Sequence, residues 1–145
     1  MLMRRASWLL CFAAAGCSVP DASRAAEAQT MTVCQLYATR QSPPAGEIRL
    51  KASAYMGPRD EAIFVDHHCP PRTAIAFRFA DHLPPTSKAA QFDRALTGDV
   101  MDVSLRAFDA EVIGTYTAAS ATSPRGLFYV DHVDWFRKQT PQQSR

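Results

Sequence analysis

The residues with the clearest capacity for chemistry are four histidines, because imidazole nitrogens bind transition metals and exchange protons near neutral pH. They stand at the ends of expected strands, as His67, His68, His82 and His132, and three of them directly follow an aspartate. His68 precedes Cys69, and histidine with cysteine suits zinc or copper. No His-x-x-x-His or Cys-x-x-Cys pair fixes two ligands at once. Surface histidines are therefore the plainer interpretation, and a metal site is the alternative.

A second group of candidates consists of aromatic and cationic side chains in expected strands and in the loops beside them. Tyrosine and arginine often anchor binding interfaces. The members of this group are Tyr55, Arg59, Arg78 and Arg125. They predict a binding face, while a solvated strand surface is the plainer interpretation of the same residues.

Motifs for catalysis are missing from the sequence. There is no Gly-x-Ser-x-Gly elbow and no glycine-rich phosphate loop. Ser104, Ser120 and Ser123 have no base partner that the sequence identifies. Asp131 and Asp134 lie near a strand end, where carboxylates are usually solvated. We therefore expect a protein that is not an enzyme and that uses no cofactor.

The N-terminal residues 1–16 have the pattern of an export signal, with Arg4 and Arg5 followed by an apolar run. The run is shorter than the roughly 20 residues that a spanning helix needs. It ends in Ala-Ala-Gly-Cys17, which resembles the lipobox of bacterial lipoproteins. The resemblance implies that Cys17 is lipidated and anchors the mature chain to a membrane. An ordinary cleaved signal peptide is the alternative.

The residue after Cys17 is Ser18, and by resemblance to lipoprotein sorting signals it favours the outer membrane, facing the periplasm. A soluble periplasmic or secreted protein is the alternative. The chain has 16 basic and 14 acidic residues, and removal of Arg4 and Arg5 with the signal leaves the mature protein near neutral. Nucleic-acid binding is therefore not expected, because it normally requires a basic surface.

Two cysteines remain after Cys17. In an oxidising compartment the simplest expectation is that Cys34 and Cys69 form a disulfide. It would close a loop of about 35 residues and stabilise the fold by about 3–4 kcal/mol. Use of Cys69 as a metal ligand is the alternative.

The elements that must position these residues are mostly strands. Residues 17–31 have too little apolar surface to fold and predict a tether, followed by a domain over 32–138 and a polar tail over 139–145. Alternation predicts strands at 47–56, 62–66, 74–80, from 100 through 113, and 127–136. In the fourth strand, one face should hold Met101, Val103, Leu105 and Ala107. Capping signals predict helices at 33–40 and 88–96.

This order, three strands, a helix and two strands, resembles the OB-fold, a mainly β, five-stranded Greek-key barrel. With the lipobox at Cys17, Val33-Cys34 and the stretch from Asp66 to Cys69, the chain is similar to a group of small exported bacterial OB-fold-like lipoproteins with no assigned function. The resemblance implies paired cysteines, but no catalytic residue or ligand. We expect a binding protein that recognises a protein or envelope component through the barrel face. A metal-binding periplasmic protein is the alternative.

Overall fold

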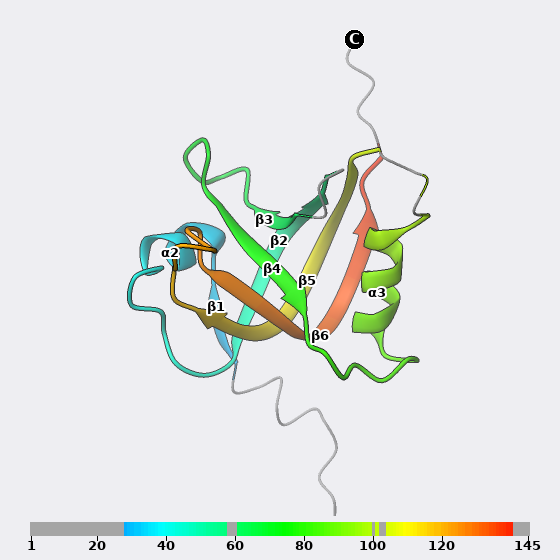
Figure 1. Ribbon diagram of the computed structural model, residues 1–145, viewed down its shortest axis with the longest axis horizontal. Helices are drawn as coiled ribbons and strands as arrows, with labels where there is room; N and C mark the ends of the chain where they lie inside the picture. Colours follow the sequence, from blue (N-terminus) through cyan, green and yellow to red (C-terminus); the bar gives the residue numbers. More distant parts are fainter. Residues whose placement is uncertain (1–27, 58–60, 100, 102–103, 141–145) are drawn as a thin grey trace, which may run out of the picture.

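Five strands close into a β-barrel, and two helices pack against it (Figure 1). The structure is a computed structural model that describes residues 28–57, 61–99, 101 and 104–140. The predicted mainly β barrel is confirmed. Its strands are β2 (Ile48–Met56), β3 (Ala62–Val65), β4 (Ala74–Phe79), β5 (Arg106–Thr117) and β6 (Leu127–Lys138).

The barrel closes because β2 has a strand on each side. It pairs antiparallel with β3 and, over its whole length, antiparallel with β5, from Ile48 opposite Gly114 to Met56 opposite Arg106. β4 and β6 pair in parallel, with Ala76 of β4 opposite Leu127 of β6. The order around the barrel is therefore β2-β3-β4-β6-β5 and back to β2.

Alternation places the core correctly in β2 and incorrectly in β5. The residues predicted to face inward in β2 are buried except Met56, which is partly buried, and the neighbouring Ser53 is buried too. β5 begins only at Arg106, and Met101 and Leu105 are 85% and 65% exposed. Its buried face instead begins at Phe108. The predicted face was wrong because β5 begins only at Arg106, so alternation among earlier residues carries no information about the strand. Val103 of the predicted face lies outside the described residues.

The start of the domain also differs from the prediction. The last residues of the expected tether form a short strand, β1 (Gln29–Met31), which pairs parallel with β2 at Ile48–Leu50. Three residues with a single apolar side chain give no periodic signal, so their position depends on the exposed edge that β2 offers. The rest of the tether, the signal segment with Cys17, and Arg59 lie outside the described residues.

The two helices begin at the predicted caps. α2 (Val33–Ala38) has a capping box, in which Gln35 N–H donates to Thr32 Oγ1 at 3.2 Å and Thr32 N–H donates to Gln35 Oε1 at 2.9 Å. α3 (Lys88–Thr97) begins after Ser87, which accepts a hydrogen bond from Ala90 N–H at 3.1 Å. Figure 1 shows the helices on opposite sides of the barrel.

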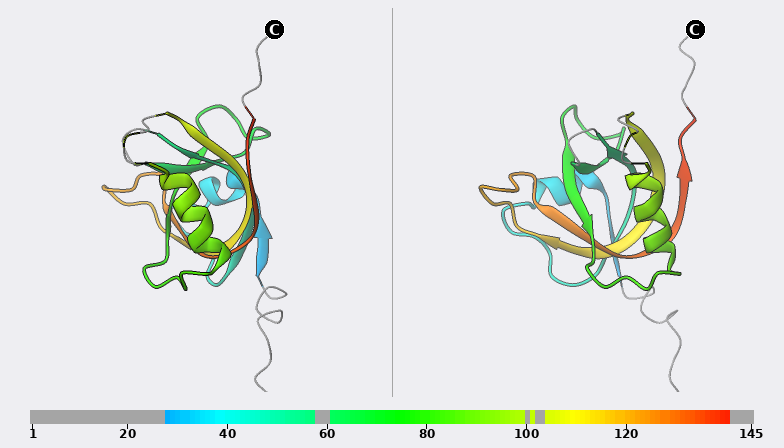
Figure 2. Two further views of the ribbon diagram at one scale, coloured as in Figure 1. Left: turned by 90° about the vertical axis from the view of Figure 1, so that its right-hand side faces the viewer. Right: turned by 45° about the vertical axis from the view of Figure 1, so that its right-hand side comes forward.

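The helices share one apolar core with the barrel. In the left view of Figure 2, α3 comes to the front and α2 lies behind the strands. Phe92 of α3 stacks on Phe136 of β6, with ring centroids 4.8 Å apart, and Val33 and Leu36 of α2 are fully buried in the same core. The helices thus exclude water from the barrel interior. No helix among the described residues is long and apolar enough to cross a membrane.

One glycine permits the close contact of β5 and β6. A β-carbon at Gly114 would lie 1.8 Å from the carbonyl oxygen of Tyr129. The pairing register shifts between Ile113 and Gly114, as at a β-bulge. Bulges and strand glycines allow strands to bend where a barrel turns a corner. Gly114 therefore permits the close approach and the register shift of β5 against β6 at this point.

Candidate functional site

The predicted disulfide is confirmed. Cys34 of α2 and Cys69, in the turn after β3, are bonded, with their Cα atoms 5.5 Å apart. Asp66 lies beside them, within a group of potential metal-ligating atoms no more than 4.8 Å apart. Because the two sulfurs are bonded to each other, neither is a thiolate that could bind a metal. The bond instead fastens α2 to the loop between β3 and β4.

The histidines are not gathered into one site. Within the described part of the chain, no group of three or more potential metal-ligating side chains includes a histidine. His68 Nδ1 lies 2.9 Å from Asp66 Oδ1, and His132 Nε2 lies 3.2 Å from an oxygen of Asp134. The His68 backbone N–H donates to Asp66 and lowers the pKa of that carboxyl. Each of these two histidines thus has its own local carboxylate.

The other two histidines do not complete such a set. His67 Nε2 lies 3.3 Å from the hydroxyl of Tyr55. His82 is exposed in the turn after β4. The structure therefore does not bring together the ligands that the metal alternative requires.

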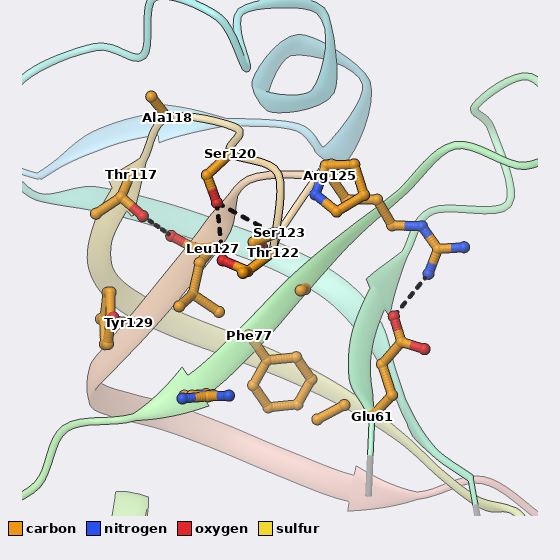
Figure 3. Close-up of a pocket in the computed structure, with 14 residues that line it drawn as sticks. Glu61, Phe77, Thr117, Ala118, Ser120, Thr122, Ser123, Arg125, Leu127 and Tyr129 are labelled. Atoms are coloured by element: carbon orange, nitrogen blue, oxygen red, sulfur yellow. Dashed lines mark hydrogen bonds and ion pairs between the residues drawn. The ribbon is translucent and has the colours of Figure 1, made fainter. Parts of the chain in front are cut away.

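Two of the predicted binding residues line one groove. Arg78 of β4 and Arg125 of the β5–β6 loop border a groove of about 690 Å³, which lies over β4, β6 and the end of β5 (Figure 3). Tyr55 lies elsewhere, in a separate groove with His67. The lining residues used below are Glu61, Phe77, Arg78, Thr117, Arg125 and Tyr129.

The two arginines of the groove differ in their partners. Arg125 Nη1 lies 3.1 Å from Glu61 Oε1, and the exposed side-chain fractions are 43% for Arg125 and 64% for Glu61. Arg78 is exposed and makes no hydrogen bond or ion pair with any other described residue. Arg78 therefore presents an uncompensated positive charge to the groove.

Most of the hydroxyl groups along the groove are already used. Thr117 Oγ1 donates to the Leu127 carbonyl at 3.2 Å, and Ser123 Oγ donates to the Gly126 carbonyl at 3.0 Å. Ser120 and Thr122 share a hydrogen bond of 3.2 Å. These bonds shape the loop (Figure 3). The strongest groups left for a ligand are the two guanidinium groups.

The loop that forms one wall of the groove is held from two sides. Tyr116 Oη donates to the Arg125 carbonyl at 2.7 Å, and burial raises the pKa of Tyr116 to about 12, so its hydroxyl stays protonated. The left-handed Gly126, at φ +73°, allows this approach, because a side chain there would collide with the Tyr116 hydroxyl. Ala119 N–H donates to the Arg40 carbonyl at 2.7 Å, just after α2. The wall is therefore preformed.

Sequence reasoning missed two residues of the groove, Tyr129 and Glu61. The parallel register of β4 and β6 sets Tyr129 directly opposite Arg78, and both side chains are exposed. Glu61 stands just before β3 and reaches Arg125 (Figure 3). Tyr129 could have been identified from its place in the last strand once β6 was paired with β4, whereas Glu61 carries no signal in the sequence.

A second charged cluster lies where β2, β5 and β6 meet. Arg49 forms ion pairs with Glu111, at 2.7 Å, and with Asp134. Trp135 Nε1–H donates to the second oxygen of Glu111 at 3.0 Å, and Lys51 lies over the Trp135 ring. We call these five residues the seam cluster. Their charges are matched to one another across three strands.

Comparison with known proteins gives no further assignment: no family model, no curated protein and no solved structure matches this chain.

Proposed function

We propose that this chain is a non-enzymatic binding module of the bacterial envelope, built on an OB-type barrel. The strand order, the parallel β4–β6 pair and the place of α3 between β4 and β5 in the chain support the OB assignment. OB-folds bind ligands over the second and third strands and the loop between the fourth and fifth. In this barrel those parts are β3, β4 and the β5–β6 loop, which together line the groove.

The observation that carries the proposal is that Arg78 in this groove has no hydrogen-bond or ion-pair partner among the described residues. An exposed arginine next to an exposed aromatic residue, Tyr129, is the combination found at the energetic centres of interfaces. The groove has a preformed wall, so little ordering would oppose binding. The partner is a protein or another envelope component.

The anchor is the lipid that Cys17 carries in this proposal. It restricts the barrel to a membrane surface, in the outer membrane facing the periplasm. The chain is similar in this respect to small exported bacterial OB-fold-like lipoproteins. Intact mass of the membrane-bound protein tests the anchor: a species that begins at Cys17 with added acyl mass supports it, and a soluble species that begins further along the chain contradicts it.

Site-specific photocrosslinking in a bacterial host tests the groove. A photoreactive residue at Thr122, exposed in the loop, should yield a discrete adduct with an envelope component. The same residue at Thr86, exposed before α3 and outside the groove, serves as the positional control. The adduct from Thr122 should disappear when Arg78 and Arg125 are both changed to Ala.

The matched control variant is Arg72→Ala. Arg72 is also exposed and without a hydrogen bond or ion pair to the rest of the described chain, but it lies outside the groove. The Arg72→Ala variant removes the same charge as Arg78→Ala and should leave the Thr122 adduct intact. An adduct that survives the double substitution, or that Arg72→Ala abolishes equally, would contradict the proposed function.

A further inference from the structure

We infer that the groove recognises an acidic peptide segment, and that Glu61 occupies part of this site as an internal competitor. The inference rests on the proposed function and names the class of partner. It starts from the ion pair between Arg125 and Glu61, which Figure 3 shows at the edge of the groove.

The groove already accommodates one carboxylate. Glu61 Oε1 lies 3.1 Å from Arg125 Nη1. The Glu61 side chain is 64% exposed and that of Arg125 is 43% exposed, so solvent screens their attraction and the pair is easily exchanged. A carboxylate from a partner can therefore take the place of Glu61 at little cost, because one exposed ion pair replaces another.

A second carboxylate position follows from Arg78. This arginine makes no hydrogen bond or ion pair within the described chain, and its guanidinium can hold a carboxylate through two parallel hydrogen bonds. Tyr129 stands opposite Arg78 in the next strand and offers an aromatic surface for the aliphatic part of a bound side chain. The groove thus offers a partner two positions for a carboxylate, one at Arg78 and one at Arg125 where Glu61 would be displaced.

The chemistry of the present occupant favours a peptide. Glu61 is a glutamate side chain on a chain segment that enters β3, so the groove already fits a carboxylate on that length of aliphatic stem. The accessible apolar surface beside the arginines comes from Tyr129 and the partly buried Leu127, because Phe77 is only 2% exposed. Acidic polysaccharides carry the same charge on a rigid ring, and they serve as the competing outcome of the test.

Fluorescence anisotropy on the full mature chain tests the inference. The probe is a short labelled peptide with two glutamates, and a matched peptide has glutamines in their place. The glutamate peptide should bind, and Glu61→Gln should tighten its Kd about two- to fivefold, the factor that release of an exposed ion pair provides. Arg78→Ala should weaken binding about tenfold, whereas Arg72→Ala should not change it.

The folding of the variants is checked separately. Glu61→Gln should leave the unfolding midpoint unchanged, because the ion pair that it removes is exposed. Raising the salt concentration should weaken binding of the glutamate peptide and leave binding of the glutamine peptide unchanged.

Three results would overturn the inference: equal binding of the two peptides, an unchanged or weaker Kd in Glu61→Gln, and selective binding of an oligosaccharide of uronic acids in place of the peptide. Failure of the inference differs from failure of the proposed function. If the peptides do not bind but the Thr122 adduct still requires Arg78 and Arg125, the groove is a binding site for another chemistry. If the adduct is also independent of the arginines, both conclusions fail.

Discussion

The seam cluster and the groove use the same residue types, arginine beside carboxylates and an aromatic ring, with opposite results. In the seam cluster Arg49 is 22% exposed and has a carboxylate from each of two other strands. In the groove Arg125 is 43% exposed with one exposed partner, and Arg78 has none within the described chain. The first arrangement holds three strands together, and the second leaves positive charge available.

This difference shows that residue type alone does not identify a binding site. Arg49 and Arg78 both point outward from strands, and alternation treats them alike. What separates them is the neighbouring strand: β2 lies beside β5, which supplies Glu111, whereas β4 lies beside β6, which supplies Tyr129. Cross-strand partners therefore decide which arginine is structural.

The largest expected loss of stability comes from disrupting the contact between β5 and β6, which supports both the seam cluster and the groove. Gly114→Ala should lower the free energy of unfolding by about 3 kcal/mol or more, because the added methyl group meets the Tyr129 carbonyl. Gly57→Ala is the control, since nothing lies within 4 Å of a β-carbon there. Urea unfolding of both variants measures the effect. Equal midpoints would show that the two strands can separate without cost.

Removal of the disulfide should have the next largest effect. Replacing Cys34 and Cys69 by Ser should cost about 2–4 kcal/mol, because the unfolded chain gains the freedom of the open loop. Since α2 supports the groove wall through Arg40, hydrogen exchange at the Ala119 amide should accelerate more than at Val112 in β5. Uniform acceleration would mean that the wall does not depend on α2.

Neutralising the two arginines compares the regions directly. Arg49→Met should cost about 2 kcal/mol, because Glu111 and Asp134 then share a partly buried surface without their common cation. Arg78→Met should change stability by less than about 0.5 kcal/mol, because Arg78 is exposed and makes no hydrogen bond or ion pair with any other described residue. Thermal unfolding of the Arg49→Met and Arg78→Met variants is the measurement. A larger loss for Arg78 would reverse the assignment of roles.

A smaller effect concerns the stability of the fold at low pH. The side-chain amide of Gln139 donates to Asp109 Oδ1 at 2.8 Å and, with help from Ser53, lowers the pKa of this carboxyl. Because the folded pKa lies below the unfolded one, the contribution is complete above about pH 4 and is lost as the pH falls through the folded pKa. Gln139→Ala should therefore reduce the loss of stability between pH 6 and pH 3.

The control for this experiment is Gln91→Ala, since Gln91 is an exposed glutamine whose side chain donates to the nearby Thr86 carbonyl and, among the described residues, to no carboxylate. Its acid sensitivity should match that of the wild type in urea titrations at the two pH values. An unchanged pH dependence in Gln139→Ala would remove Asp109 as a source of acid sensitivity.

Local signals in the sequence predicted the elements well. Thr32 and Gln35 marked the start of α2, Ser87 marked the start of α3, and alternation located β2 and β4 to within a residue or two. These features depend on neighbouring residues, so a linear pattern carries them. The bonded cysteines were also predictable, because Cys34 and Cys69 are the two cysteines that lie outside the expected signal segment and its Cys17.

Features that depend on distant partners were missed. β1 forms by pairing with the edge of β2. β5 begins only at Arg106, whose side chain donates to the Leu96 and Thr97 carbonyls of α3, and its buried face begins at Phe108. Arg78 and Arg125 were named from residue type, but their shared groove depends on the β4–β6 register. Glu61 could be identified only from the three-dimensional structure, which places it beside Arg125.

The pairing of β2 with β5 also governs the time at which the molecule can fold. Ile48 meets Gly114, and Met56 meets Arg106, so each contact joins residues that are far apart along the chain. Contacts of this kind slow folding, because a long loop must close before they form. During synthesis β2 lacks one of its partners until β5 has left the ribosome. The closed barrel therefore forms only after nearly the whole domain has been synthesised.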